Sequence, residues 1–261
     1  MPLVKHELRQ GRTSLLIWTA SIGFLLAVCV FLFPEMKGQM GSVSDMFASM
    51  GSFTEAFGMD RLNFGTLIGF YAIECGNILG LGGAFFASLC AVGILSKEEK
   101  DKTAEFLLTH PISRVRILTE KLIAVLLQIT AMNVLIYALA VGSIAAVGEE
   151  IPWKEISLLH LGYYLLQLEL AGICFGFSAF LRKGSAGVGL GIAVMMYFMN
   201  LIANIADVAE FLKYITPFGY CEAADIVSSG SLDAGMVAIG VAMALAGIAA
   251  AYLKYTKKDI H

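Results

Sequence analysis

The sequence is poor in charge. Only 15% of its 261 residues are Asp, Glu, Lys or Arg, against about 25% in soluble domains. A soluble domain of this length would need more charge to cover its surface, which excludes that class of protein. The net charge of −3 also argues against nucleic-acid binding, which favours a basic excess.

Several chemical motifs are missing as well. The five cysteines form no C-x-x-C pair, so neither a zinc site nor a redox pair is indicated. No H-E-x-x-H occurs, and no histidine lies in the middle of an apolar stretch. We therefore expect no metal site and no catalytic residue. The ATP-binding motif G-x-x-x-x-G-K-[ST] is also absent, so we expect no ATP hydrolysis by this chain itself.

What the sequence has is apolar length. Hydrophobic residues make up 58% of the chain, and a helix needs about 20 mostly apolar residues to cross a bilayer. Six stretches qualify: residues 14–33, 67–95, 122–147, 157–180, 185–205 and 234–253. We predict an all-α integral membrane protein in which residues 1–261 form one domain of six transmembrane helices.

The positive charges predict the orientation. If the N-terminus is cytoplasmic, the cytoplasmic segments carry 14 of the 18 Lys and Arg residues and the outer connections carry 4. Lys and Arg accumulate on the cytoplasmic side of membrane proteins. We expect both termini in the cytoplasm.

Two further segments have helical patterns. The lead Leu3–Thr13 alternates apolar and charged residues, which is typical of a helix lying on the inner membrane surface. The alternative is a basic flank that only sets the topology. The connection Ala206–Asp233 begins with apolar residues, and we predict a short helix that dips back between spans five and six. Pro217 and Gly219 would mark its break.

The segment Ser96–Lys121 is the most specific part of the sequence. Its first half can form a short helix in which Ala104, Leu107 and Leu108 share an apolar face. Pro111 ends that helix, because a residue before proline avoids the α region, and Ser113 is a suitable N-cap for the third span. The alternative is a charged loop that only fixes topology, but such a loop needs no apolar face.

The residues from Glu98 to Arg114, EEKDKTAEFLLTHPISR, carry a family resemblance. They resemble the E-x-E-x-G-T-x-E-x-L-L-x-x-P-[IV]-S-R stretch between spans two and three of ABC-2 type transporter permeases, in which a lysine such as Lys121 opens the next helix. Lys102 replaces the usual glycine. Arg116 replaces a frequent glutamate, so Ser113 lacks its capping-box partner.

The resemblance implies a coupling helix at Ser96–His110 that docks on a separate ATP-binding subunit. By this resemblance the docking residues are Glu98, Glu105, Phe106, Leu107, Pro111 and Arg114. ATP and Mg²⁺ would be bound by that partner, with no cofactor in this chain. The resemblance also implies an exporter in a bacterial plasma membrane, in which this permease pairs with a second permease chain, identical or not.

Polar residues inside the spans are candidates for a translocation path: Glu74, Glu169, Asn200 and Asn204. Such groups are costly in lipid and usually face protein or water. The alternative is a structural pairing of the carboxyls with Asn77, Asn133 or Gln167. Three glycine pairs with GxxxG spacing predict close helix packing: Gly76/Gly80, Gly172/Gly176 and Gly187/Gly191.

Two other functions remain open. Carboxylates within the spans also suit an ATP-independent channel or secondary transporter, although the cytoplasmic helix does not. An intramembrane enzyme is less well supported, because paired reactive groups at a common depth are missing from the sequence.

Overall fold

A computed structural model describes residues 1–38, 51–97, 112–181 and 186–257. This part of the chain contains helices and no strand. Six helical segments are long and apolar enough to cross a membrane, which confirms the predicted all-α, six-span fold. Their bounds are α1 Pro2–Lys37, α4–η2–α5 Leu67–Val92, α8 Arg114–Val147, α9 Trp153–Ser178, α10 Ala186–Ile205 and α12 Ala234–Thr256.

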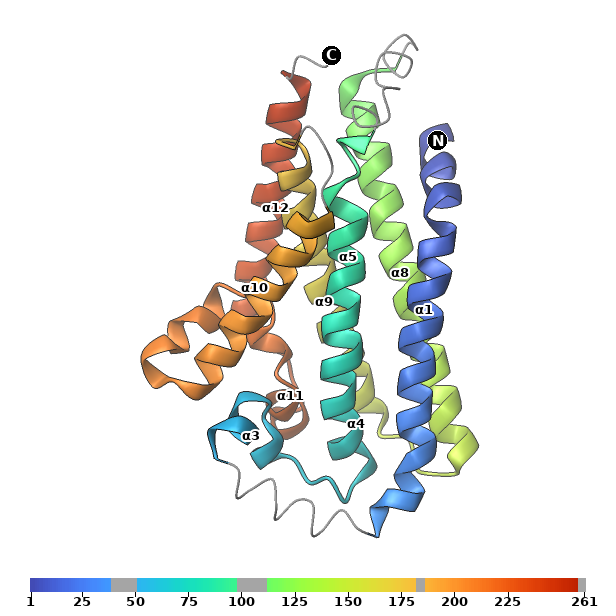
Figure 1. The fold of residues 1–261 in the computed structure, drawn as a ribbon, viewed down its shortest axis with the longest axis vertical. Helices are drawn as coiled ribbons and strands as arrows, with labels where there is room; N and C mark the ends of the chain where they lie inside the picture. Colours follow the sequence, from blue (N-terminus) through green and yellow to red (C-terminus); the bar gives the residue numbers. More distant parts are fainter. Residues whose placement is uncertain (39–50, 98–111, 182–185, 258–261) are drawn as a thin grey trace.

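Helix α9 lies at the centre of the bundle. It packs against α12, α5 and α8, while α1 runs along α8 and α10 packs on α5. Figure 1 shows that α1 begins and α12 ends at the same end of the bundle. The cytoplasmic placement of that end remains a prediction from the charge count.

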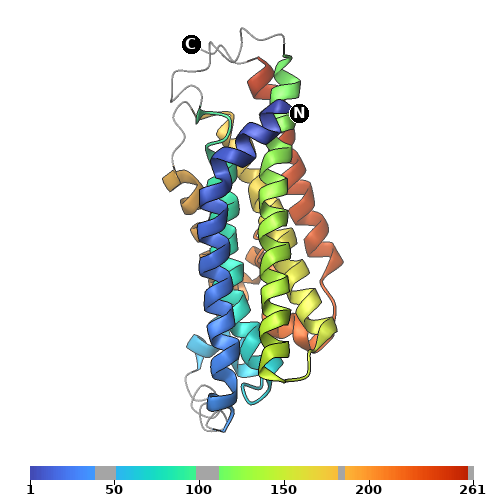
Figure 2. The ribbon, with the colours of Figure 1, turned by 90° about the vertical axis from the view of Figure 1, so that its right-hand side faces the viewer.

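The N-terminal lead is not a separate helix. It is continuous with the first span in α1, and Figure 2 shows a bend near its start. The backbone N–H groups of Leu3 and Val4 donate to Glu120 Oε2 of α8, at 3.0 and 3.3 Å. A carboxylate thus satisfies two of the free N–H groups at the positive end of the α1 dipole. Contact of the lead with the membrane surface stays a prediction.

The second span is interrupted by a π-helix. It runs from α4 (Leu67–Cys75) through η2 (Gly76–Leu81) to α5 (Gly82–Val92). A Cβ added at Gly76 would lie 2.9 Å from Tyr163 Oη, and one at Gly80 would lie 3.0 Å from Tyr163 Cε1. The predicted packing role of this glycine pair is therefore confirmed: its small residues let Tyr163 of α9 approach the backbone.

The second glycine pair is also confirmed, and the third is not. A Cβ at Gly172 would lie 2.8 Å from Ala244 Cβ of α12, and one at Gly176 would lie 2.8 Å from Gly247 Cα. Gly187 and Gly191 are exposed, and a Cβ at Gly191 would meet nothing within 4 Å. Among the described residues Gly191 has no packing neighbour, because the face of α10 that meets α5 is the one carrying Gly189.

The connection between α10 and α12 is largely helical. It comprises η3 (Asp207–Tyr214), η4 (Gly219–Cys221) and α11 (Ala223–Ser229). The chain turns after η3, and Thr216 Oγ1 donates to the Met196 carbonyl of α10 at 2.9 Å. The predicted break around Pro217 and Gly219 is thus found. Entry of this segment into the bilayer remains a prediction.

The start of α12 is capped by a side chain. Asp233 Oδ1 accepts hydrogen bonds from the N–H groups of Gly235 and Met236, at 2.8 and 3.0 Å. We expect Asp233→Ala to lower the free energy of unfolding by about 0.5–2 kcal/mol, because two N–H groups lose their acceptor. Denaturation in detergent measures this change. Asp207→Ala, at an exposed position that caps no α-helix, is the control, and an equal effect of both variants would contradict the capping role.

Candidate functional site

The predicted docking segment lies mostly outside the described residues. This applies to Glu98, Glu105, Phe106, Leu107 and Pro111. Both flanks of the segment are described, on one side up to residue 97 and on the other from residue 112. The structure therefore describes the proposed docking site through the geometry of its two flanks.

Both flanks are tied to one carboxylate of α1. Glu7 is 2% exposed, and the Lys97 ammonium group donates to its Oε2. Lys121 of α8 is completely buried, with Nζ 3.6 Å from Glu7 Oε1, and it donates to the Ile94 carbonyl. Two cations from opposite flanks thus share one buried anion. Because buried charges need partners, this arrangement holds both flanks against α1.

The start of α8 is held by further polar contacts. Ser113 is the N-cap, as predicted, and its Oγ accepts from the Arg116 N–H at 3.3 Å. Arg116, at the position where the family often has glutamate, instead pairs with Glu120 across 2.8 Å.

Arg114 extends to another helix. Its Nη1 donates to the carbonyls of Tyr255 and Thr256 at the end of α12, both at 3.2 Å. Cations are favourable at the negative end of a helix dipole. The described contacts of Arg114 therefore join α8 to α12, and its predicted contact with an ATP-binding subunit stays a prediction.

The two carboxylates predicted inside the spans lie apart. Glu74 faces α1, where Cys29 Sγ lies 3.8 Å from its Oε2. Glu169 is 2% exposed, and neither of its carboxylate oxygens has a hydrogen-bond partner among the described residues. It faces α12, since a Cβ added at Gly240 would overlap its carboxylate.

The amides considered as structural partners pair with each other. Asn133 Nδ2 of α8 donates to Gln167 Oε1 of α9 at 2.7 Å. Gln167 thus faces α8, whereas Glu169 lies on the other side of α9, toward α12. The four residues predicted to line a translocation path therefore lie in three separate parts of the folded bundle. Of these four, Asn200 and Asn204 lie together.

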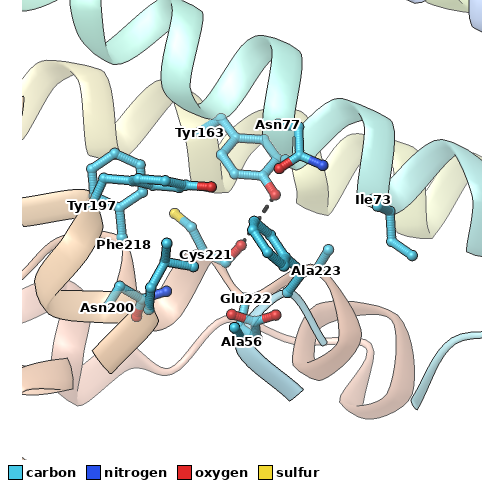
Figure 3. Close-up of a pocket in the computed structure, with 13 residues that line it drawn as sticks. Ala56, Ile73, Asn77, Tyr163, Tyr197, Asn200, Phe218, Cys221, Glu222 and Ala223 are labelled. Atoms are coloured by element: carbon cyan, nitrogen blue, oxygen red, sulfur yellow. Dashed lines mark hydrogen bonds between the residues drawn. The ribbon is translucent and has the colours of Figure 1, made fainter. Parts of the chain in front are cut away.

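Asn200 lines a small cavity near the end of the bundle away from the start of α1 (Figure 3), and Asn204 adjoins it through Glu222. The cavity measures about 50 Å³ and lies between α4–η2, α9, α10, residues 56–57 and the segment from Phe218 to Ala223. Asn204 Nδ2 donates to Glu222 Oε2 at 2.9 Å and to the Ala56 carbonyl at 3.0 Å. Figure 3 shows the Tyr163 and Tyr197 side chains pointing into the same space.

Glu222 is the acidic group of this cavity. Burial raises the pKa of its carboxyl above the ordinary value, while the Asn204 hydrogen bond and the charge of Arg61 act in the opposite direction. Arg61 itself is paired with Asp225 across 2.5 Å at the surface. Among the described residues that line the cavity, no Lys or Arg matches the negative charge of Glu222.

A comparison with protein-family models covers nearly the whole chain. A family model described as ABC-2 family transporter protein matches residues 1–260. The chain belongs to the ABC-2 transporter family. No curated protein matches the sequence. Membership agrees with six apolar helices, and this ABC-2 chain is a multi-pass membrane protein that serves as the permease component of an ABC transporter.

The structure adds residues that the sequence did not single out in this ABC-2 permease. Glu7 and Lys97 join Lys121 in the ion cluster next to the docking segment, and Tyr163, Tyr197 and Glu222 line the cavity with Asn200. The sequence counted Glu7 among the charged residues of the amphipathic lead, a pattern that did not indicate its burial. The residues of the cavity come from distant segments, and no local pattern connects them.

Proposed function

We propose that this chain is the permease subunit of an ATP-driven exporter, and that a separate ATP-binding subunit docks on residues 96–110. The family match over residues 1–260 carries this proposal. Two permease chains and two ATP-binding subunits would form the transporter. ATP and Mg²⁺ would be held entirely by the ATP-binding subunits.

The proposed docking residues have stated roles. Phe106 and Leu107 are the apolar anchors, Glu98, Glu105 and Arg114 are the charged partners, and Pro111 ends the helix. A few buried aromatic and charged residues usually carry most of the energy of an interface. We place the largest share on Phe106.

The ion cluster of Glu7, Lys97 and Lys121 supports a route by which motion of the ATP-binding subunits would reach the membrane spans. Closure of the ATP-binding subunits would displace the docked segment. Lys97 and Lys121 connect the two flanks to Glu7 of α1, and Arg114 connects α8 to α12. A displacement of the segment would therefore reach α1 and α12.

We expect Phe106→Asp to abolish docking. The tagged chain is purified from its native membranes in mild detergent, the co-purifying proteins are identified, and the ATPase activity of the eluate is measured. A nucleotide-binding subunit should accompany the wild type and fall by at least about tenfold in the variant, because a charge replaces a buried anchor worth about 2 kcal/mol or more.

The matched control is Val208→Asp, which places the same charge at a site that is 92% exposed in η3. This variant should retain the subunit. Absence of any nucleotide-binding subunit from well-folded wild-type protein would refute the proposal. Retention of the subunit by Phe106→Asp would refute the docking site.

A further inference from the structure

The cavity beside Glu222 is separate from the flanks of the segment on which we propose that an ATP-binding subunit docks. It lies near the opposite end of the bundle from the ion cluster and is built from α4–η2, α9, α10 and the connection that follows α10. Its wall includes the π-helical residues Gly76 and Asn77. Such π-helical turns inside α-helices occur frequently at functional sites.

Hydrogen-bond acceptors face this cavity. Glu222 supplies a carboxylate that is 9% exposed, oriented by the 2.9 Å bond from Asn204 Nδ2. Asn200 is 6% exposed and lines the cavity, and its Oδ1 has no hydrogen-bond partner among the described residues. The Cys221 carbonyl accepts from Tyr163 Oη at 3.1 Å and has a second lone pair.

An unpartnered buried acceptor needs an explanation, because leaving one costs about 1–3 kcal/mol. Asn200 Oδ1 is such an acceptor, whereas Glu222 Oε2 already accepts from Asn204 Nδ2 and what Glu222 lacks is a cation within the cavity lining described by the structure. Of the described residues that line the cavity, none is Lys or Arg. The nearby cation Arg61 is bound to Asp225 instead.

Aromatic rings form much of the remaining wall. Phe57, Tyr163, Tyr197 and Phe218 all line the cavity, and the rings of Tyr197 and Phe218 meet edge to face, with centroids 5.4 Å apart. Aromatic faces attract cations. A carboxylate, an amide oxygen and several rings around one space favour an organic cation over a bare metal ion, which prefers a shell of oxygens.

The size of the cavity limits the occupant. Its volume of about 50 Å³ corresponds to only about three to five water-sized probes at roughly 10–15 Å³ each. A methylammonium group fits such a space, and a bulky drug does not. A primary ammonium also brings three N–H donors for the acceptors described above.

We propose that this cavity binds the primary ammonium group of a small organic amine. Glu222 neutralises the charge, Asn200 Oδ1 accepts one N–H, and the rings of Tyr163 and Tyr197 enclose the group. Binding requires only this chain, so the test is independent of the docking of an ATP-binding subunit.

The test measures equilibrium binding of radiolabelled methylammonium to the purified full-length chain in lipid nanodiscs at constant ionic strength. We expect saturable binding by the wild type. Glu222→Gln should weaken it by about ten- to a hundredfold, since a hydrogen bond to a charged group contributes about 1.5–3 kcal/mol. Asn200→Leu should weaken it by about tenfold and provides a second variant if Glu222→Gln does not fold.

The control is Glu210→Gln, which removes a carboxylate that is exposed in η3 and should leave the affinity unchanged. The fold of each variant is checked by gel filtration and thermal melting. The absence of saturable binding by the folded wild type would overturn the proposal. Unchanged affinity in both Glu222→Gln and Asn200→Leu would also overturn it, and so would displacement of methylammonium by an equal concentration of Na⁺.

Discussion

Replacing Lys121 with Met should lower the free energy of unfolding by about 3–5 kcal/mol, the usual cost of removing one partner from a buried ion pair. Lys121 is completely buried, contacts Glu7 and donates to the Ile94 carbonyl. Met fills a similar volume but supplies no charge and no donor. Of its two cations among the described residues, Glu7 would retain Lys97, and the Ile94 carbonyl would lose the ammonium donor. Chemical denaturation in detergent measures the effect.

A double-mutant cycle separates the ion pair from general packing. Glu7→Gln combined with Lys121→Met should cost less than the sum of the two single variants, because the second change removes a charge that the first has left unpaired. The exposed Lys5 on the same end of α1 is the control, and Lys5→Met should change stability by no more than about 0.5 kcal/mol. Additive costs for Glu7→Gln and Lys121→Met would show that the two side chains are not coupled.

Hydropathy predicted the existence of every span, because crossing a bilayer requires an apolar run that the sequence displays directly. It placed the ends less well. The third span was predicted from residue 122, whereas α8 begins at Arg114. The extra turns carry charged residues that hydropathy excludes. Arg116 pairs with Glu120 of the same helix, whereas Lys121 and Arg114 have partners on other elements. Those last partners are distant in sequence.

The residues of the candidate site could be predicted from the sequence only where their spacing matched the period of a helix. The spacing of Asn200 and Asn204 placed them on one face of a helix, and both lie beside the Glu222 cavity. For Glu74 and Glu169 the sequence indicated a depth in the membrane but not a direction. The structure turns Glu74 toward α1 and Glu169 toward α12. Direction depends on how whole helices pack, which a single helical pattern does not contain.

The glycine pairs show the same limit. GxxxG spacing puts two small residues on one face, but it does not say which helix approaches that face, or whether one does. Gly172 and Gly176 meet α12, whereas Gly191 meets open space. Side chains at these positions should therefore have opposite effects although the local sequence pattern is the same.

We expect Gly176→Leu to prevent correct packing of α12 on α9. A Cβ at this position would lie 2.7 Å from the Gly247 carbonyl oxygen and 2.8 Å from its Cα. These are backbone atoms, so no side chain can rotate to make room, and the two helices must separate. Overpacking typically costs about 1–3 kcal/mol and occasionally more, and a rigid backbone neighbour places this variant at or above the upper end. Thermal melting and the yield of monodisperse protein in detergent measure the loss.

Gly191→Leu is the matched control, because it makes the same change in the same sequence pattern at a position with open space. The purified chain should tolerate it, and helix propensity alone favours the replacement by several tenths of a kcal/mol. Equal destabilisation by the two variants would mean that α12 does not rest on Gly176. A loss seen for Gly191→Leu only in the assembled transporter would instead show that this face of α10 meets another chain.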